Sequence, residues 1–283
     1  MQTPFGPLNR EALRAVAAAL GRDPFPPGEG AVGVADLLSD PYADPADAHR
    51  RLALAERRFV RAGDRRAVFL TVYGAVTARV RRDLAGDRFA DPEWVAGYLV
   101  AFANRYRRAL LAYERDDRER VPRAWLLAFD GALAGETLVA QDALLGINAH
   151  VVHDLALALD DAGIDPRAER RRDHDAVNAV LRALVDTEQD LLADRYAPGL
   201  GTLDAAAGRF DERAAFRTLA EGRDWAWRCA VALADGGPLA RRGVRWLLDA
   251  VSLGAGRLLV RPTRDERVRE RLRAAERGGE PRS

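Results

Sequence analysis

The sequence predicts an all-α protein, a single multi-helix globular domain around a buried central helix at about residues 136–161. Apolar side chains recur at spacings of three and four residues along most of the chain. Capping residues, glycines and prolines stand at the ends of these segments. No segment alternates with the two-residue period of a half-buried strand. With 283 residues, 48% of them hydrophobic, the chain is long enough to bury a full core.

The composition excludes several classes of protein. The net charge is +1, from 44 basic and 43 acidic residues, so no overall field favours nucleic acid or an anionic membrane. The single cysteine, Cys229, leaves no intramolecular disulfide and no CxxC metal site. The N-terminus lacks the pattern of a signal peptide, and no run reaches 18 uncharged apolar residues. We expect a soluble cytoplasmic protein with no nucleic-acid partner and no membrane insertion, and a small-molecule ligand stays open.

Residues 1–45 are predicted to form an N-terminal helix and a connection. Asn9 is a suitable cap for a short helix that ends at Leu20. Residues 21–45 are rich in proline and glycine, which predicts an irregular segment over the surface.

The main domain is expected over residues 46–262, where the helical pattern begins. The first helix runs from Ala46 to a stop at Gly63, and Asp64 is expected to cap the next. Asp91 followed by Pro92 predicts the cap and first position of a long helix.

A helix beginning near Trp125 is expected to break at Gly131 and Gly135, before the central helix. After the central helix, Asp173 or Asp175 is the expected cap of a further helix.

Two more helices are predicted at about residues 211–234 and 239–260. Residues 263–283 form a charged C-terminal tail that is expected to fray.

The central segment from Gln141 to Leu159 is the most apolar part of the chain and carries Asn148, His150, His153 and Asp154. At about 100° per residue, Asn148 falls in the middle of the apolar face. His150 and Asp154 share one flank, because residues four apart lie on the same side of a helix. His153 falls on the opposite flank, where we expect it to be solvated. Burial of such polar groups costs roughly 1–3 kcal/mol each unless they find partners.

The segment from Leu144 to His150, followed by Asp154-Leu155, resembles the LLLGINAHINxDL segment of a family described only as a domain of unknown function. The resemblance spans roughly residues 50–190. It includes Arg58-Phe59, Gly63-Asp64, Tyr73, Thr77, Phe102, Tyr106, Pro122, Trp125, Phe129, Asp175 and Asn178. The family implies no activity.

A second resemblance is local. Leu145-Gly146 with His150 and Asp154 is similar to the LGxxxHYxxD helix of zinc-dependent phospholipase C and the P1-type nucleases, which implies that His150 and Asp154 hold zinc. Those families use several further histidines and a free N-terminal tryptophan, whereas this chain begins with Met1 and has four histidines. A three-zinc site is therefore excluded, and a site for one divalent metal stays open.

A catalytic zinc takes about three protein ligands and an open position. The third ligand beside His150 and Asp154 is expected from Asp64, His174, Asp173 or Asp175, which lie near predicted helix starts. Two interpretations need no metal: a structural hydrogen bond between His150 and Asp154, or acid–base chemistry by the same pair.

The leading functional hypothesis is a polar pocket at His150, Asp154 and Asn148, with metal-assisted hydrolysis of an ester or phosphoester as the first reaction to test. The alternative is a non-catalytic binding or scaffold protein in which these residues form a buried hydrogen-bond network. Whether the protein is an enzyme is left open.

Two further sets of residues support these hypotheses. The aromatic residues Tyr73, Tyr106, Tyr113 and Trp125 are expected in the core, with their polar atoms paired, and would line a pocket if they surround His150. Gly146, Gly254 and Gly256 are expected to permit close packing of helices.

Overall fold

A computed structural model describes residues 33–135, 137–196, 212–261 and 265–276, and the side chains of these residues except 139–140, 182–196, 212–218 and 272–276. Every regular element within these residues is helical, which confirms the all-α prediction. The elements are α2 (Ala35–Leu38), α3 (Pro45–Arg61), α4 (Ala67–Asp83), α5 (Pro92–Glu114), η1 (Arg118–Arg120), α6 (Arg123–Ala134), α7 (Val139–Asn148), η2 (Ala149–Asp154), α8 (Leu155–Ala162), α9 (Arg167–Tyr196), α11 (Glu212–Asp235), α12 (Pro238–Val260) and α13 (Glu266–Glu276). The helix expected at residues 9–20 lies outside the described residues.

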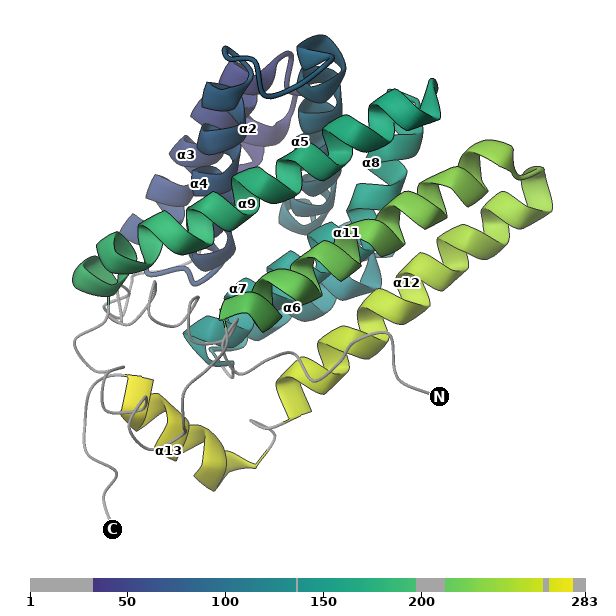
Figure 1. The fold of residues 1–283 in the computed structure, drawn as a ribbon. Coiled ribbons are helices and arrows are strands. Elements are labelled where there is room, and N and C mark those ends of the chain that lie inside the picture. Colours follow the sequence, from purple (N-terminus) through teal and green to yellow (C-terminus); the bar gives the residue numbers. More distant parts are fainter. Residues whose placement is uncertain (1–32, 136, 197–211, 262–264, 277–283) are drawn as a thin grey trace.

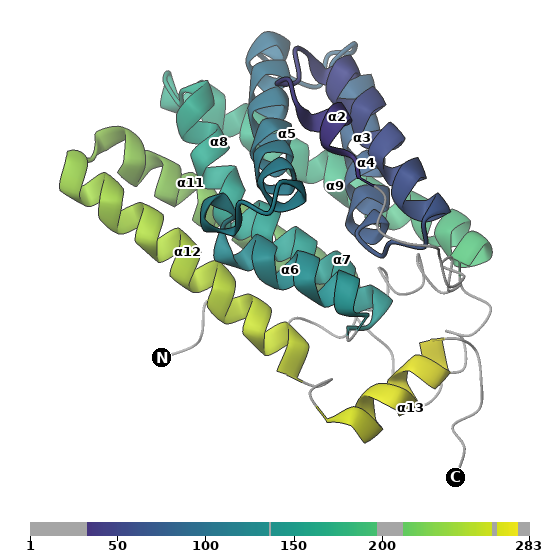
Figure 2. The same cartoon turned by 180° about the vertical axis from the view of Figure 1, so that it is seen from behind.

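The predicted central helix is continuous in space and consists of α7, η2 and α8. Helices α4, α5, α6, α11 and α12 all pack against it. Figure 1 shows α9 and α11 on one side of it, and Figure 2 shows α5, α6 and α12 on the other. The segment is therefore enclosed by helices that precede it and follow it in the sequence, as its apolar composition predicts.

Local signals set several helix ends where they were expected. The Asp91 carboxylate accepts a hydrogen bond from the backbone N–H of Trp94 at 2.9 Å, and Pro92 begins α5. Gly63 and Gly135 adopt positive φ angles of 67° and 59° just after α3 and α6. These conformations suit glycine, so the sequence determines both helix ends.

The apolar side chains form two clusters that meet at the central helix. One cluster contains Leu144, Leu145 and Ala149 and packs them against α2 to α6. The other contains Leu155 and Leu159 and packs them against α5, α9 and α11. The turn Ala149–Asp154, which carries the polar residues, lies at the junction between the two clusters.

The connection before residue 46 is partly core, contrary to the expectation of a surface segment. Val34, Leu38 and Tyr42 are buried and belong to the first cluster. The charged tail also differs from expectation, because it contains α13, a helix of 11 residues. The apolar residues of the connection are too few to show a helical spacing, and the charged composition of the tail hides the periodicity of α13. Neither element was therefore predicted.

Three helix boundaries were predicted wrongly. Helix α4 begins at Ala67 with Arg66, not Asp64, as its N-cap residue. Gly131 lies inside α6 and does not break it. Helix α9 starts at Arg167, before either predicted cap. Asp173 instead accepts hydrogen bonds from the backbone N–H groups of Ala90 and Asp91 at 2.7 and 2.8 Å. The Asp173 carboxylate therefore joins α9 to the residues that precede α5 and does not cap its own helix.

One helical stretch, Gln141–Ala162, is long and apolar enough to cross a membrane by composition alone. Most of it is buried inside the protein, which is typical of the core helix of a soluble domain.

Candidate functional site

The Asp154 carboxylate is the centre of a buried hydrogen-bond network. Its Oδ2 accepts from Nε1 of Trp125 at 2.8 Å and pairs with Nδ1 of His150 at 3.0 Å. Its Oδ1 pairs with Nδ1 of His153 at 2.9 Å. The His150 and Asp154 side chains are each only 2% exposed. Helix α6 supplies the indole and η2 supplies the other three groups, so the network joins two neighbouring helices.

The protonation state of the pair follows from its surroundings. Burial raises the pKa of the Asp154 carboxyl, but the hydrogen bonds from His150 and His153 lower it by more, so the carboxyl is ionised at neutral pH. Burial lowers the pKa of His150, and Asp154 offsets only part of this effect. A carboxylate can only accept hydrogen bonds, so Nδ1 of His150 carries the proton. Nε2 of the neutral ring then carries a lone pair.

The backbone around this network is a π-helix over the six residues Ala149–Asp154. Its i→i+5 hydrogen bonds make the turn wider than an α-helical turn, so the wheel drawn at 100° per residue fails from Ala149 onward. His153, expected on the solvated flank, has a side chain that is 12% exposed and is bonded to Asp154. That expectation was wrong because the widened turn brings both histidines to one carboxylate.

Aromatic rings surround the His150 imidazole. It stacks on Phe102 with ring centroids 3.5 Å apart and planes at 6°. Tyr73 meets it edge-on at 4.6 Å. Nε2 is buried and has no hydrogen-bond partner in the described part of the chain. A buried polar atom without a partner lowers the stability of the fold by roughly 1–3 kcal/mol. The unpaired Nε2 is therefore a candidate contact for a bound molecule.

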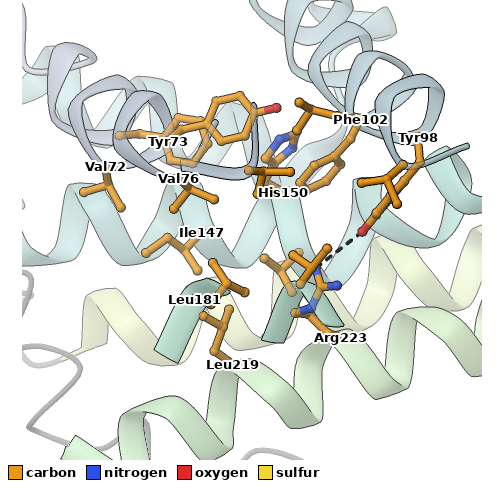
Figure 3. A pocket seen from close by; sticks show the side chains of 16 residues that line it. Val72, Tyr73, Val76, Tyr98, Phe102, Ile147, His150, Leu181, Leu219 and Arg223 are labelled. Atoms are coloured by element: carbon orange, nitrogen blue, oxygen red, sulfur yellow. Dashed lines mark hydrogen bonds between the residues drawn. The ribbon is translucent and has the colours of Figure 1, made fainter. Parts of the chain in front are cut away.

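His150 lies in the wall of a cavity of about 120 Å³. Figure 3 shows Tyr73, His150 and Phe102 along one side of it and Leu181, Leu219 and Arg223 along the other. Most of the wall is aliphatic: Val72, Val76, Val80, Val95, Leu99, Ile147, Val151, Val177, Leu181 and Leu219. An apolar cavity with a few polar groups is the common form of a small-molecule site.

Arg223 is the charged group of this cavity and is only 4% exposed. Its Nε donates to Oδ1 of Asn178 at 2.6 Å and its Nη1 to the hydroxyl of Tyr98 at 3.3 Å. Its Nη2 contacts the carbonyl oxygen and Nδ1 of His174 at 2.7 and 3.3 Å. All these partners are neutral groups. Arg223 was not predicted at the site, because an arginine in an amphipathic helix is normally expected on the solvated face.

The other residues expected at the site lie elsewhere. Asn148 donates from Nδ2 to the carbonyl oxygen of Ser252 at 2.8 Å, which ties the central helix to α12. Asp64 forms a buried ion pair with Arg66. Asp175 is exposed and pairs with Arg171 at 2.8 Å. Asn148 is therefore buried and hydrogen-bonded, as its place on the apolar face required, but it does not line the cavity.

The ligand set expected for a metal is not assembled. Among the described residues, no group of three or more His, Cys, Asp or Glu side chains is arranged to hold a metal ion. His174 contacts Arg223, and both oxygens of Asp154 are taken by N–H groups. A catalytic zinc takes about three protein ligands, so these residues do not fit one.

The predicted aromatic residues divide into two groups. Trp125 and Tyr113 have paired polar atoms, the latter with Asp130 at 2.7 Å. The hydroxyls of Tyr73 and Tyr106 are buried without a partner in the described residues, contrary to expectation. Tyr73 does line the cavity at His150, together with Phe102, whose place in the wall the sequence did not show.

Stability is expected to fall as the pH is lowered from 7.5 to 5.0. Burial lowers the pKa of His150, and burial with the nearby Arg223 lowers that of His174. The unfolded chain, with histidine pKa values near 6.5, then binds more protons than the folded one, so unfolding becomes easier as the pH falls below 6.5. We expect a loss of about 2 kcal/mol in urea titrations. The His174→Gln variant should show a smaller dependence on pH, and a flat profile for the wild type would contradict the assignment.

A family model described as a family of unknown function (DUF5995) matches residues 46–262. No curated protein and no solved structure matches the chain.

Proposed function

We propose, for a chain that belongs to the DUF5995 family of unknown function, that it binds a small apolar molecule in the cavity beside His150. The observation that carries the proposal is the buried Nε2 of His150, which has no partner among the described residues and belongs to a ring in the cavity wall. A ligand with an N–H or O–H group would satisfy it. Asp154 and Phe102 hold the rest of the ring, so Nε2 keeps one orientation, and a donor reaches it once the side chains that bury it shift.

The cavity limits the size of the ligand. An apolar cavity of about 150 Å³ holds a benzene molecule. The volume here is about 120 Å³, so the ligand has on the order of five or six non-hydrogen atoms inside the cavity. A larger molecule would need the surrounding helices to separate.

The same geometry supports acid–base chemistry without a metal. The lowered pKa keeps His150 neutral at pH 7, so Nε2 is free to take a proton from a bound molecule. The Asp154 carboxylate would stabilise the imidazolium that forms. This chemistry is favoured over metal-assisted hydrolysis, because both carboxylate oxygens of Asp154 already accept hydrogen bonds from N–H groups.

The test uses two rings of the same size. Pyrrole donates an N–H group and furan does not, so only pyrrole can bond Nε2. By ¹⁵N-detected NMR on histidine-labelled protein, pyrrole should shift the Nε2 resonance of His150 and should bind at least about tenfold more tightly than furan. Affinities in the millimolar range are expected for so few atoms.

Two variants distinguish the contribution of Nε2 to binding from that of the aromatic ring. His150→Phe keeps the stack on Phe102 and removes Nε2, so it should lose the preference for pyrrole and keep furan binding. His153→Phe is the matched control, because His153 also bonds Asp154 but does not line the cavity. If neither ring binds wild type, the cavity is packing space and the non-catalytic network is the better account.

A further inference from the structure

Arg223 differs in its partners from Arg66, another strongly buried arginine of the described residues. Arg66 pairs with Asp64 and Glu114. Arg223 is equally buried, yet among the described residues it forms no ion pair and contacts only an amide, a hydroxyl and His174. A buried cation without an anion is costly, because the neutral acceptors replace only part of its hydration.

The donor atoms of Arg223 also leave one position open. A guanidinium has five N–H groups. Four contacts account for Nε, both N–H groups of Nη2 and one N–H of Nη1. One N–H of Nη1 thus lacks an acceptor in the described part of the chain, and the residue lies in the cavity wall. Charge and hydrogen bonding therefore both favour an anion at this side of the cavity.

A second buried arginine, Arg107, lies outside the cavity and serves as a comparison. Arg107 also lacks a carboxylate partner among the described residues, but its Nη1 donates to the backbone carbonyl oxygens of Leu38 and Ser39 and its Nε to Asn104. It does not line the cavity. Arg107 fixes the end of α2, whereas Arg223 borders empty space. The two residues can therefore be compared directly.

We infer that the ligand of this cavity is a small carboxylate whose apolar body carries one hydroxyl group, bound by its charged end to Arg223, by the hydroxyl to Nε2 of His150 and by its hydrocarbon part to the valine and leucine wall. The inference rests on the proposed function, because it assigns the chemical class of the molecule that the same cavity takes. A charged hydrogen bond to a guanidinium is stronger than a neutral one, and the low-dielectric wall strengthens it further. A carboxylate without a hydroxyl group, such as butanoate, binds through the Arg223 end alone and therefore tests that end by itself.

The experiment compares butanoate with butanamide, which have the same shape and differ in charge. We expect wild type to bind butanoate at least about tenfold more tightly than butanamide by NMR titration at pH 7. The Asn178→Asp variant places a carboxylate on the Nε side of Arg223, where the amide oxygen now accepts at 2.6 Å. It should lose the preference for butanoate and still bind butanamide, because the cation is then neutralised by the protein.

Asn104→Asp is the matched control. The Asn104 oxygen accepts from Nε of Arg107 at 2.8 Å, so this variant adds the same carboxylate beside the buried arginine outside the cavity. It should keep the preference for butanoate. Equal binding of butanoate and butanamide to wild type would overturn the inference. If pyrrole and butanamide bind while butanoate is not preferred, the proposed function stands and the carboxylate class fails; if none of them binds, both fail.

Discussion

Replacing Asp154 by alanine is expected to lower the free energy of unfolding by about 3–5 kcal/mol. The carboxylate accepts hydrogen bonds from Trp125, His150 and His153 in a buried site. Its removal leaves three N–H donors without an acceptor in the junction of the two apolar clusters. Chemical denaturation of the full chain, followed by circular dichroism, measures the loss.

Asp161→Ala is the control for this prediction. Asp161 lies about two turns beyond the π-helical segment and pairs with Arg105 at the surface, where its side chain is 40% exposed. Exposed ion pairs contribute about 0–1 kcal/mol, so this variant should be nearly as stable as wild type. If both variants lost the same amount of unfolding free energy, the buried network would contribute no more to stability than an exposed ion pair.

Replacing Gly146 by alanine is expected to destabilise the protein by about 3 kcal/mol, at the upper end of overpacking effects. A methyl group at this position would lie 2.5 Å from Cγ and 2.8 Å from Cβ of Phe69. These atoms are close to the backbone of α4, so the ring cannot simply rotate away. Either α4 and α7 separate or the ring leaves its place beside His150, which it meets at 5.6 Å. Thermal unfolding of the variant gives the size of the effect.

Gly254 supplies the opposite case on α12. An added methyl group there meets no atom within 4 Å, so Gly254→Ala should stabilise the helix by up to about 1 kcal/mol. The sequence suggested that Gly146, Gly254 and Gly256 all permit close packing. This holds for Gly146 and Gly256, and it is wrong for Gly254.

A stabilised Gly146→Ala variant would show that α4 and α7 can separate at no cost.

The architecture was predictable because it depends on local signals. The three- and four-residue spacing of apolar residues decides which segments are helical, and caps such as Asp91 or glycines such as Gly135 decide where they end. One of the errors occurs where a side chain serves a distant segment. Asp173 was expected to cap its own helix and instead bonds the residues before α5.

The site was predictable only in part. The apolar segment with Asn148, His150 and Asp154 identified the residues that needed partners, and the pairing of His150 with Asp154 follows from their spacing of four. Their partners could not be read in the same way. Trp125 comes from α6, Ser252 from α12 and Phe102 from α5, and no spacing along the chain relates them to the central helix.

The sequence by itself determined that the protein is helical, which segment is the central helix and which of its polar residues had to be bonded, because these depend on spacings within one helix. The tertiary structure alone decided that the helix widens at Ala149–Asp154, that a cavity opens beside His150, and that Arg223 faces it without a described carboxylate. These features depend on how side chains from α4, α5, α9 and α11 fill the space between helices. The distances that govern a cavity or an ion pair lie across that space, and no periodicity in the chain records them.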